Sequence, residues 1–404
     1  MSLAKNLIHL QKRYKMRLSR VYFKIIAVVL VFKIVFLAIG LIAISALPYS
    51  KSNYEINFHF PDNETKMIAH LKTWDAQHYL FLAEKGYEKG RESNRFFPLY
   101  PILIKIFSFV FQSKLLTAHL LSLALTIGSA ILLHKLVKLL SFTSKTYWLS
   151  LFLLLSFPTA FFLHLPYSES LFLFICLCYF YAYEKKNNLL QFLTAFLLPL
   201  TRPTGILIML PVLVSVSKGL RNKKVISIPT FNMPIKIPFT YLYLMTLAPL
   251  IGIACYFLFH KIVTGNFFTG IIGINSVSTW NAINVLDPGS LIRNLLSTNL
   301  VLHGFQNSIL DRIFFVLFLV ISFLIYKKLP KNYFFFSLVL GLVPLLGSFT
   351  SYMRYILPIF PIYIVMSLLI QETKSKALQY TVLVSFISIQ VILYTLHILN
   401  YWVS

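Results

Sequence analysis

Long apolar runs limit what this chain can fold into more than any other feature. Runs of about 18 residues or more recur from Val21 to the C-terminus, and a helix of that length crosses the hydrocarbon core of a bilayer. The chain is 58% hydrophobic and only 12% charged. Alternating segments typical of an outer-membrane barrel are absent. The sequence therefore predicts an all-α polytopic membrane protein.

The formal net charge of +25 does not indicate a nucleic-acid partner. Lysines and arginines gather in short connections between apolar runs, as the positive-inside rule requires of cytoplasmic loops. All three cysteines fall inside apolar runs, which argues against a disulfide framework or a metal site.

The hydropathy pattern divides into about eleven membrane segments. They are predicted at 21–47, 115–140, 147–164, 167–184, 188–201, 205–218, 239–262, 309–327, 332–350, 353–370 and 377–402. Residues 1–20 form a basic tail expected in the cytoplasm, because the following run is too long for a signal peptide. Residues 21–404 then form one multi-pass domain.

The distribution of basic residues places two long loops, 48–95 and 263–308, on the external side. This alternation requires two short segments within 188–218, which turn around Arg202 where proline and glycine interrupt the run. The stretch 96–112 is expected to lie at the membrane interface, and the pattern leaves open whether it spans.

Acidic residues are concentrated in the first external loop, where seven of the twelve lie between Glu55 and Glu92. Within it, Thr73–Lys85 is predicted to form an amphipathic helix, with Thr73 as N-cap and Gly86 as the stop. Asp75 falls in the first turn, where the helix dipole favours the ionised carboxylate. Such a group is suited to accept a proton from an attacking hydroxyl.

A structural interpretation of the same segment stays open. In that interpretation Trp74, His78 and Tyr79 anchor an interfacial helix at the level of the headgroups. Asp75 is then an ordinary partner of the helix dipole.

Four further charged residues are candidates for function, each with a structural alternative. Arg95 is a candidate phosphate contact, or part of a stiff aromatic and proline-rich entry into 96–112. Glu169, close to Tyr167, is a rare acid at the membrane boundary, and its alternative is a helix cap. Arg202 and Arg354 are suited to bind phosphate, and their alternative is to extend toward lipid headgroups.

These motifs together resemble a known family, the integral-membrane mannosyltransferases related to the enzyme that adds the second mannose in glycosylphosphatidylinositol-anchor assembly. The resemblance covers roughly residues 20–370. The motifs, in chain order, are Trp74-Asp75-x-x-His78-Tyr79, Ala83-Glu84-x-Gly86-Tyr87, Phe96-Phe97-Pro98-Leu99-Tyr100-Pro101, Pro158-Thr159-Ala160-Phe161-Phe162, Tyr167-Ser168-Glu169-Ser170, Arg202-Pro203-Thr204-Gly205 and Arg354-Tyr355.

The resemblance implies a type-C glycosyltransferase fold (GT-C) and an inverting transfer of a sugar, typically mannose, from a polyprenyl-phosphate donor to a hydroxyl of a lipid-linked or glycan acceptor. It assigns the catalytic base to Asp75. The expected substrate-binding residues are Trp74, His78, Arg95, Tyr167, Glu169, Arg202 and Arg354. With a single carboxylate centre, a tightly held divalent metal is not indicated, and no cofactor is expected.

Two other functions fit the same hydropathy, a transporter or lipid flippase and a glycan polymerase or ligase. Transporters typically carry repeated halves and polar residues near the midplane, and no repeat is evident in this sequence. The chain is expected in a prokaryotic plasma membrane with the active site outside. A eukaryotic member would lie in the endoplasmic reticulum with a small membrane partner.

Overall fold

The computed structural model describes residues 2–57, 66–214, 240–275, 289, 296, 301–303, 308–342 and 351–403. Within these ranges the regular structure is helical, apart from an isolated bridge between Val301 and Ser308. The basic loop 218–236, most of the predicted external loop 263–308 and the end of the segment predicted at 332–350 lie outside the described residues.

Five of the described helices are long and apolar enough to cross a membrane. They are α1 (Ser2–Ala46), α6 (Lys114–Leu139), α11 (Thr240–Thr264), α14 (Ile309–Lys328) and α18 (Lys376–Ile398). Four of them agree closely with a predicted segment. The membrane-spanning part of α1, Ser19–Ala46, agrees with the segment predicted at 21–47, but the helix begins at Ser2, within the predicted basic tail. These helices confirm the prediction of an all-α integral membrane protein, whereas the number of spans stays a prediction.

The remaining apolar helices of the bundle are shorter. They are α7 (Ser144–Ser156), α8 (Glu169–Glu184), α9 (Asn188–Leu197), α15 (Lys331–Leu342), α16 (Tyr352–Ile356) and α17 (Pro361–Glu372). Two predicted segments are therefore not single helices. The segment at 147–164 stops being α-helical at Ser156, and the segment at 353–370 is divided into α16 and α17. Pro158 and Pro358 explain both breaks, because proline restricts the preceding residue and lacks an amide hydrogen. Pro361 is the first residue of α17, where the missing amide hydrogen breaks no helical hydrogen bond.

Polar side chains define where many of these helices begin. The N-cap residues Ser113, Thr143, Asn187, Ser308 and Ser375 each accept a hydrogen bond from the backbone amide three residues on. Such a cap satisfies one of the amides that the first turn leaves without an intrahelical partner.

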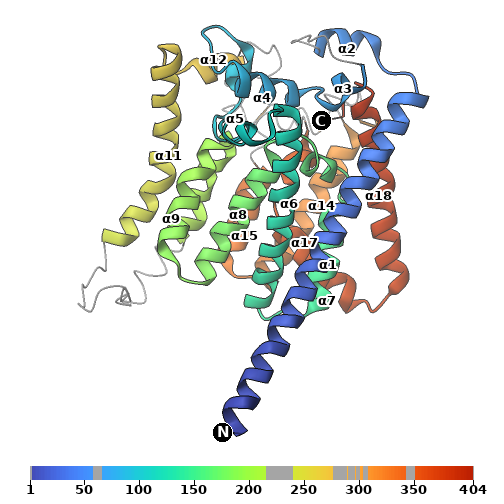
Figure 1. Ribbon diagram of the computed structural model, residues 1–404, viewed down its shortest axis with the longest axis vertical. Coiled ribbons are helices and arrows are strands. Elements are labelled where there is room, and N and C mark those ends of the chain that lie inside the picture. The colour runs from blue at the N-terminus through green and yellow to red at the C-terminus, as the bar shows by residue number, and fades with distance from the viewer. Residues whose placement is uncertain are drawn as a thin grey trace.

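The two ends of the bundle differ (Figure 1). The first turns of α1 project from one end, where the connections α6–α7, α8–α9 and α17–α18 also lie. The opposite end carries α2 (Lys51–Asn57), α3 (Lys66–Leu71), α4 (Asp75–Glu84), α5 (Leu99–Phe111) and α12 (Thr269–Asn275). The predicted basic connections and the helices of the loop predicted to be external, 48–95, are thus at opposite ends.

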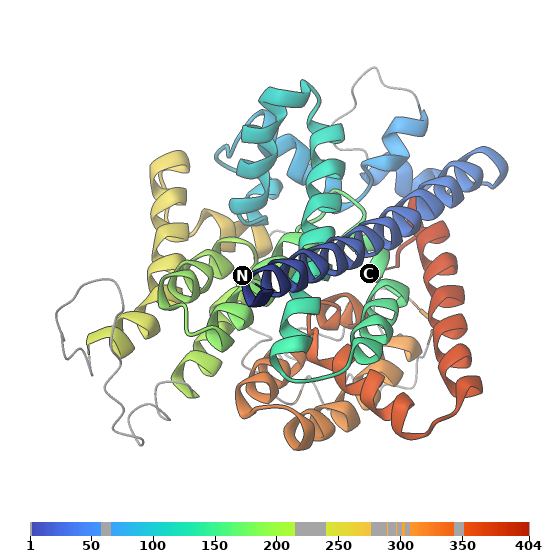
Figure 2. The same ribbon diagram turned by 60° about the horizontal axis from the view of Figure 1, so that its bottom comes forward.

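Helix α1 packs against α6 and α18 along one side of the bundle (Figure 2). Helix α8 contacts both α6 and α9, and α17 contacts α7 and α14. The segment 157–168 joins α7 to α8 and contains only a short 3-10 helix, η2 (Ala160–Leu163), which contacts α6, α7, α8 and α18. Its residues are all buried.

The buried backbone of the 157–168 segment is satisfied by side chains of neighbouring helices. Ser122 of α6 donates to the carbonyl of Leu165 at 2.7 Å, and Thr126 donates to that of Leu163 at 2.9 Å. Lys33 of α1 donates to the carbonyl of His164 and lies 3.0 Å from Nδ1 of His119. Irregular backbone is tolerated in a membrane protein only where such partners replace water.

We expect Lys33→Met to destabilise the protein by about 1 kcal/mol, because it removes one hydrogen bond to the buried carbonyl of His164 and leaves only His119, whose Nδ1 lies 3.3 Å from that oxygen. Thermal unfolding of the purified protein in mild detergent measures the effect. Lys24→Met removes an exposed lysine from the same helix and is the matched control. Equal melting temperatures for the two variants would contradict a capping role for Lys33.

Candidate functional site

Helix α4, which carries Asp75, begins later than the sequence predicts. Its first residue is Asp75 and its N-cap position is Trp74, so the prediction of Thr73 as N-cap is wrong. The Thr73 hydroxyl instead donates to Oδ1 of Asn400, just beyond α18. The predicted stop is confirmed, because Gly86 adopts φ 84° and donates to the carbonyl of Leu82 at 3.0 Å.

Trp74 has an unfavourable backbone conformation, with φ 57° and ψ −131°. A residue with a side chain is held there only when surrounding contacts impose it. Its indole packs edge-on against Trp402 at 5.2 Å between ring centroids. Its N–H has no hydrogen-bond partner among the described residues. The strained residue thus fixes the start of α4, directly before Asp75.

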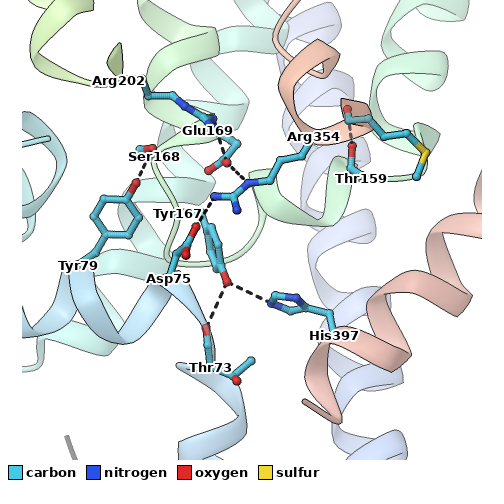
Figure 3. A network of polar contacts seen from close by, with 11 residues as sticks. Thr73, Asp75, Tyr79, Thr159, Tyr167, Ser168, Glu169, Arg202, Arg354 and His397 are labelled. Carbon is cyan, nitrogen blue, oxygen red and sulfur yellow. Dashed lines mark hydrogen bonds and ion pairs between the residues drawn. The ribbon is translucent and has the colours of Figure 1, made fainter. Parts of the chain in front are cut away.

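Four charged residues from distant parts of the chain form one alternating series (Figure 3). Oδ2 of Asp75 lies 2.8 Å from Nη2 of Arg354, and Nε of Arg354 donates to Oε1 of Glu169. The same Oε1 lies 2.9 Å from Nη1 of Arg202. We call Asp75, Glu169, Arg202 and Arg354 the charge cluster.

The members of the charge cluster differ in burial. The Glu169 side chain is 0% exposed, whereas that of Asp75 is 26% exposed. Aromatic rings lie against the guanidinium of Arg354. Cζ of Arg354 lies 4.6 Å from the ring centroid of Phe162 and 4.9 Å from that of Tyr167. The two ring centroids are only 4.9 Å apart, so both rings lie on the same side of the guanidinium.

Asp75 is ionised at neutral pH. Burial alone would raise the pKa of its carboxyl, but the charges of Arg354 and Arg95 and the hydrogen bond from Arg354 together bring the pKa below its ordinary value of 3.8. The carboxylate has the protonation state that a general base requires.

Tyrosines join α4 to the 157–168 segment. The Tyr79 hydroxyl lies 2.8 Å from Oγ of Ser168. Tyr167 donates to the carbonyl of Thr73 at 3.2 Å, and its oxygen lies 3.3 Å from Nε2 of His397 in α18. Ser168 therefore does not cap α8 with its side chain, and Glu169, in the first turn, pairs with two arginines.

Backbone contacts fix the position of Arg354. The amide of Met353, the preceding residue, donates to Oδ1 of Asp311 at 2.9 Å, and its carbonyl accepts from Thr159 at 3.1 Å. Neither Asp311 nor Thr159 is among the predicted site residues, although Thr159 lies in one of the motifs that carry the resemblance. The signal for Asp311 was available, because an acid at the start of an apolar span is by default a functional candidate.

His78 and Arg95 lie outside the charge cluster. Nδ1 of His78 lies 2.8 Å from Oγ of Ser93, and the ring stacks on Phe96. Arg95 pairs with Glu92 and lies over the same Phe96 ring. Arg95 acts on Asp75 only through its charge. The contacts of His78 are those of a residue that packs α4 against η1 (Glu92–Arg95).

The predicted turn at Arg202 is confirmed. After α9 the chain forms two short 3-10 helices, η3 (Leu198–Leu200) and η4 (Pro203–Ile208), on either side of Arg202. Gly205 is required for this turn, because a Cβ there would lie 2.1 Å from the carbonyl oxygen of Leu198. The tight turn directs Arg202 toward Glu169.

The cluster combines an ionised carboxylate that is partly open to solvent with two arginines behind it. A carboxylate of this kind accepts a proton, and arginine edges stabilise an anionic leaving group. Among the residues described, no group of three or more His, Cys, Asp or Glu side chains could hold a metal ion.

No protein-family model and no curated protein sequence matches the chain. Two solved structures of the Archaeoglobus fulgidus oligosaccharyltransferase are similar to it. The form tethered to an acceptor peptide containing the NVT sequon aligns with a TM-score of 0.41 and 12% identity over 90% of this chain. The apo form gives 0.39 and 13% over 92%. This chain spans 55% of the length of each, and at such scores the likeness supports no argument about function.

Proposed function

We propose that this protein is a membrane glycosyltransferase of the GT-C type. It transfers a sugar, typically mannose, from a polyprenyl-phosphate donor to a hydroxyl of a lipid-linked or glycan acceptor. The observation that carries the proposal is the charge cluster, in which a partly exposed base and two arginines converge at the end of the bundle formed by the first external loop.

The proposed reaction is a single inverting displacement. Asp75 takes the proton from the acceptor hydroxyl, and the acceptor oxygen forms a bond to the anomeric carbon of the sugar. The bond from that carbon to the phosphate oxygen breaks, and the electron pair leaves with the polyprenyl phosphate. Arg354 and Arg202 stabilise the departing phosphate, and Asp75 afterwards releases its proton to water.

The location of the cluster favours this enzyme over a transporter. A transporter needs its polar residues near the middle of the bilayer, between related halves. Here the base belongs to a short helix, α4, at one end of the bundle (Figure 1). Trp74 directly precedes the base in the chain, and we assign its aromatic ring to contact with the sugar.

We expect Asp75→Asn to lower sugar transfer by about 10²- to 10⁴-fold, because asparagine cannot take the acceptor proton. Membranes containing the protein are supplied with labelled polyprenyl-phosphate-mannose and an acceptor lipid, and transferred label is counted at equal expression. Glu84→Gln, at the exposed end of the same helix, is the control and retains activity. Unchanged transfer by Asp75→Asn would remove Asp75 as the base.

A further inference from the structure

The carboxylates of the charge cluster already occupy two of the donor atoms of Arg354. Asp75 holds Nη2 at 2.8 Å, and Glu169 holds Nε. A phosphate that binds this arginine through both Nη atoms has to use Nη2, where it meets the negative charge of Asp75 at hydrogen-bonding distance. The two arginines and two carboxylates sum to zero charge, so the cluster has no excess positive charge to balance a further anion. Phosphate binding in this geometry therefore favours the release of a carboxylate.

Glu169 is the carboxylate that stays. It is 0% exposed and pairs with both arginines through the same oxygen. Removing it from these partners would leave a buried carboxylate without compensation, at high cost in free energy. Thr159 and Asp311 further hold the backbone next to Arg354, so the arginine is also fixed.

Asp75 is the carboxylate that can leave. Its pairing with Arg354 is its one ion pair among the described residues, and more than a quarter of its side chain is exposed. It follows Trp74, whose backbone is strained in this arrangement. Solvent can take up the carboxylate when an anion replaces it on the arginine.

We propose that the donor's phosphate binds by taking the place of Asp75 on Arg354, so that donor binding frees the base. This inference rests on the proposed function. A carboxylate released from an arginine is a stronger base than a paired one. The acceptor hydroxyl is therefore activated only after the donor has bound. We call this replacement of Asp75 by the donor phosphate the exchange, and it sets the order in which the two substrates take part in the reaction.

The exchange predicts that a variant without the catalytic carboxylate binds the lipid phosphate more tightly. Asp75→Asn should bind polyprenyl monophosphate about tenfold more tightly than wild type, because asparagine does not compete for the arginine. Asp75→Ala should bind equally tightly, and Arg354→Gln should lose binding. A carboxylate that only oriented Arg354 would give the opposite result, with weaker binding by Asp75→Asn.

The measurement is equilibrium binding of polyprenyl monophosphate to purified protein in nanodiscs, with inorganic phosphate and phosphatidylglycerol as comparison ligands. Glu84→Gln removes the same charge from α4 outside the cluster and should bind as wild type does. If Asp75→Asn gains affinity for polyprenyl monophosphate alone, the exchange is supported. An equal gain in affinity for phosphatidylglycerol, or the same gain for polyprenyl monophosphate in Glu84→Gln, overturns the proposal that the donor phosphate replaces Asp75.

The two proposals fail in different ways. If wild type transfers sugar but Asp75→Asn binds the polyprenyl lipid no more tightly, the exchange is wrong and the proposed function stands. If wild type neither binds polyprenyl monophosphate nor transfers sugar, the proposed function fails, and the exchange fails with it.

Discussion

Glu169→Gln is expected to abolish sugar transfer and to destabilise the protein. Glu169 is the shared partner of Arg202 and Arg354 and is fully buried. Glutamine leaves two buried arginines with one carboxylate between them, and breaking a buried ion pair in this way costs about 3–5 kcal/mol. Because Arg354 also holds Asp75, we expect a loss of transfer of at least about 100-fold from misplacement of the reacting groups.

Glu184→Gln provides the matched control for this experiment. Glu184 is the last residue of the same helix, α8, where it accepts a hydrogen bond from Tyr333 far from the charge cluster. Thermal unfolding and transfer are measured for both variants at equal expression. If Glu169→Gln has the melting temperature of wild type and keeps its transfer activity, the charge cluster is not the centre of the active site.

Arg354→Gln is expected to change the pH dependence of transfer as well as its rate. In the intact protein the arginine charge and its hydrogen bond lower the pKa of Asp75 below 3.8 against the effect of burial. The base then stays ionised as the pH falls, and the acid limb of kcat/KM lies below about pH 4. Without Arg354, burial is less opposed and the pKa of Asp75 rises, so the acid limb moves to higher pH.

The residual activity of Arg354→Gln, followed from neutral to acidic pH, measures this shift. Arg95→Gln is a useful comparison, because Arg95 acts on the pKa of Asp75 only through its charge and makes no contact with it. Its acid limb should move in the same direction by a smaller amount. An acid limb unchanged in Arg354→Gln would mean that Asp75 is not the group whose ionisation limits the reaction.

The long helices could be predicted because their evidence is local. A run of apolar residues of sufficient length forms a helix in a bilayer whatever its neighbours are, so α6, α14, α18 and the apolar part of α1 (Ser19–Ala46) appear close to their predicted bounds. Gly86 and the turn at Arg202 were also predictable, since glycine and proline act on the backbone at their own positions.

Contacts between distant segments were not predictable in the same way. Thr73 is a favourable N-cap residue by type, but its hydroxyl bonds to Asn400, more than three hundred residues later. Pro158 indicates a break in the apolar run at 147–164, but nothing in the run indicates that its second half is buried and satisfied by Lys33, Ser122 and Thr126. In both cases the local structure depends on hydrogen bonds to residues far away in the sequence.

The sequence by itself determined the membrane class, the main helices and the identities of Asp75, Glu169, Arg202 and Arg354 as candidates, because charged residues are costly beside apolar spans and therefore conspicuous. Only the tertiary structure decided that these four lie in one cluster, that Glu169 pairs with both arginines, and that His78 and Arg95 lie outside it. Ion pairing depends on distances of a few ångströms between side chains, and only the packing of α4, α8, α16 and the turn at Arg202 brings them that close.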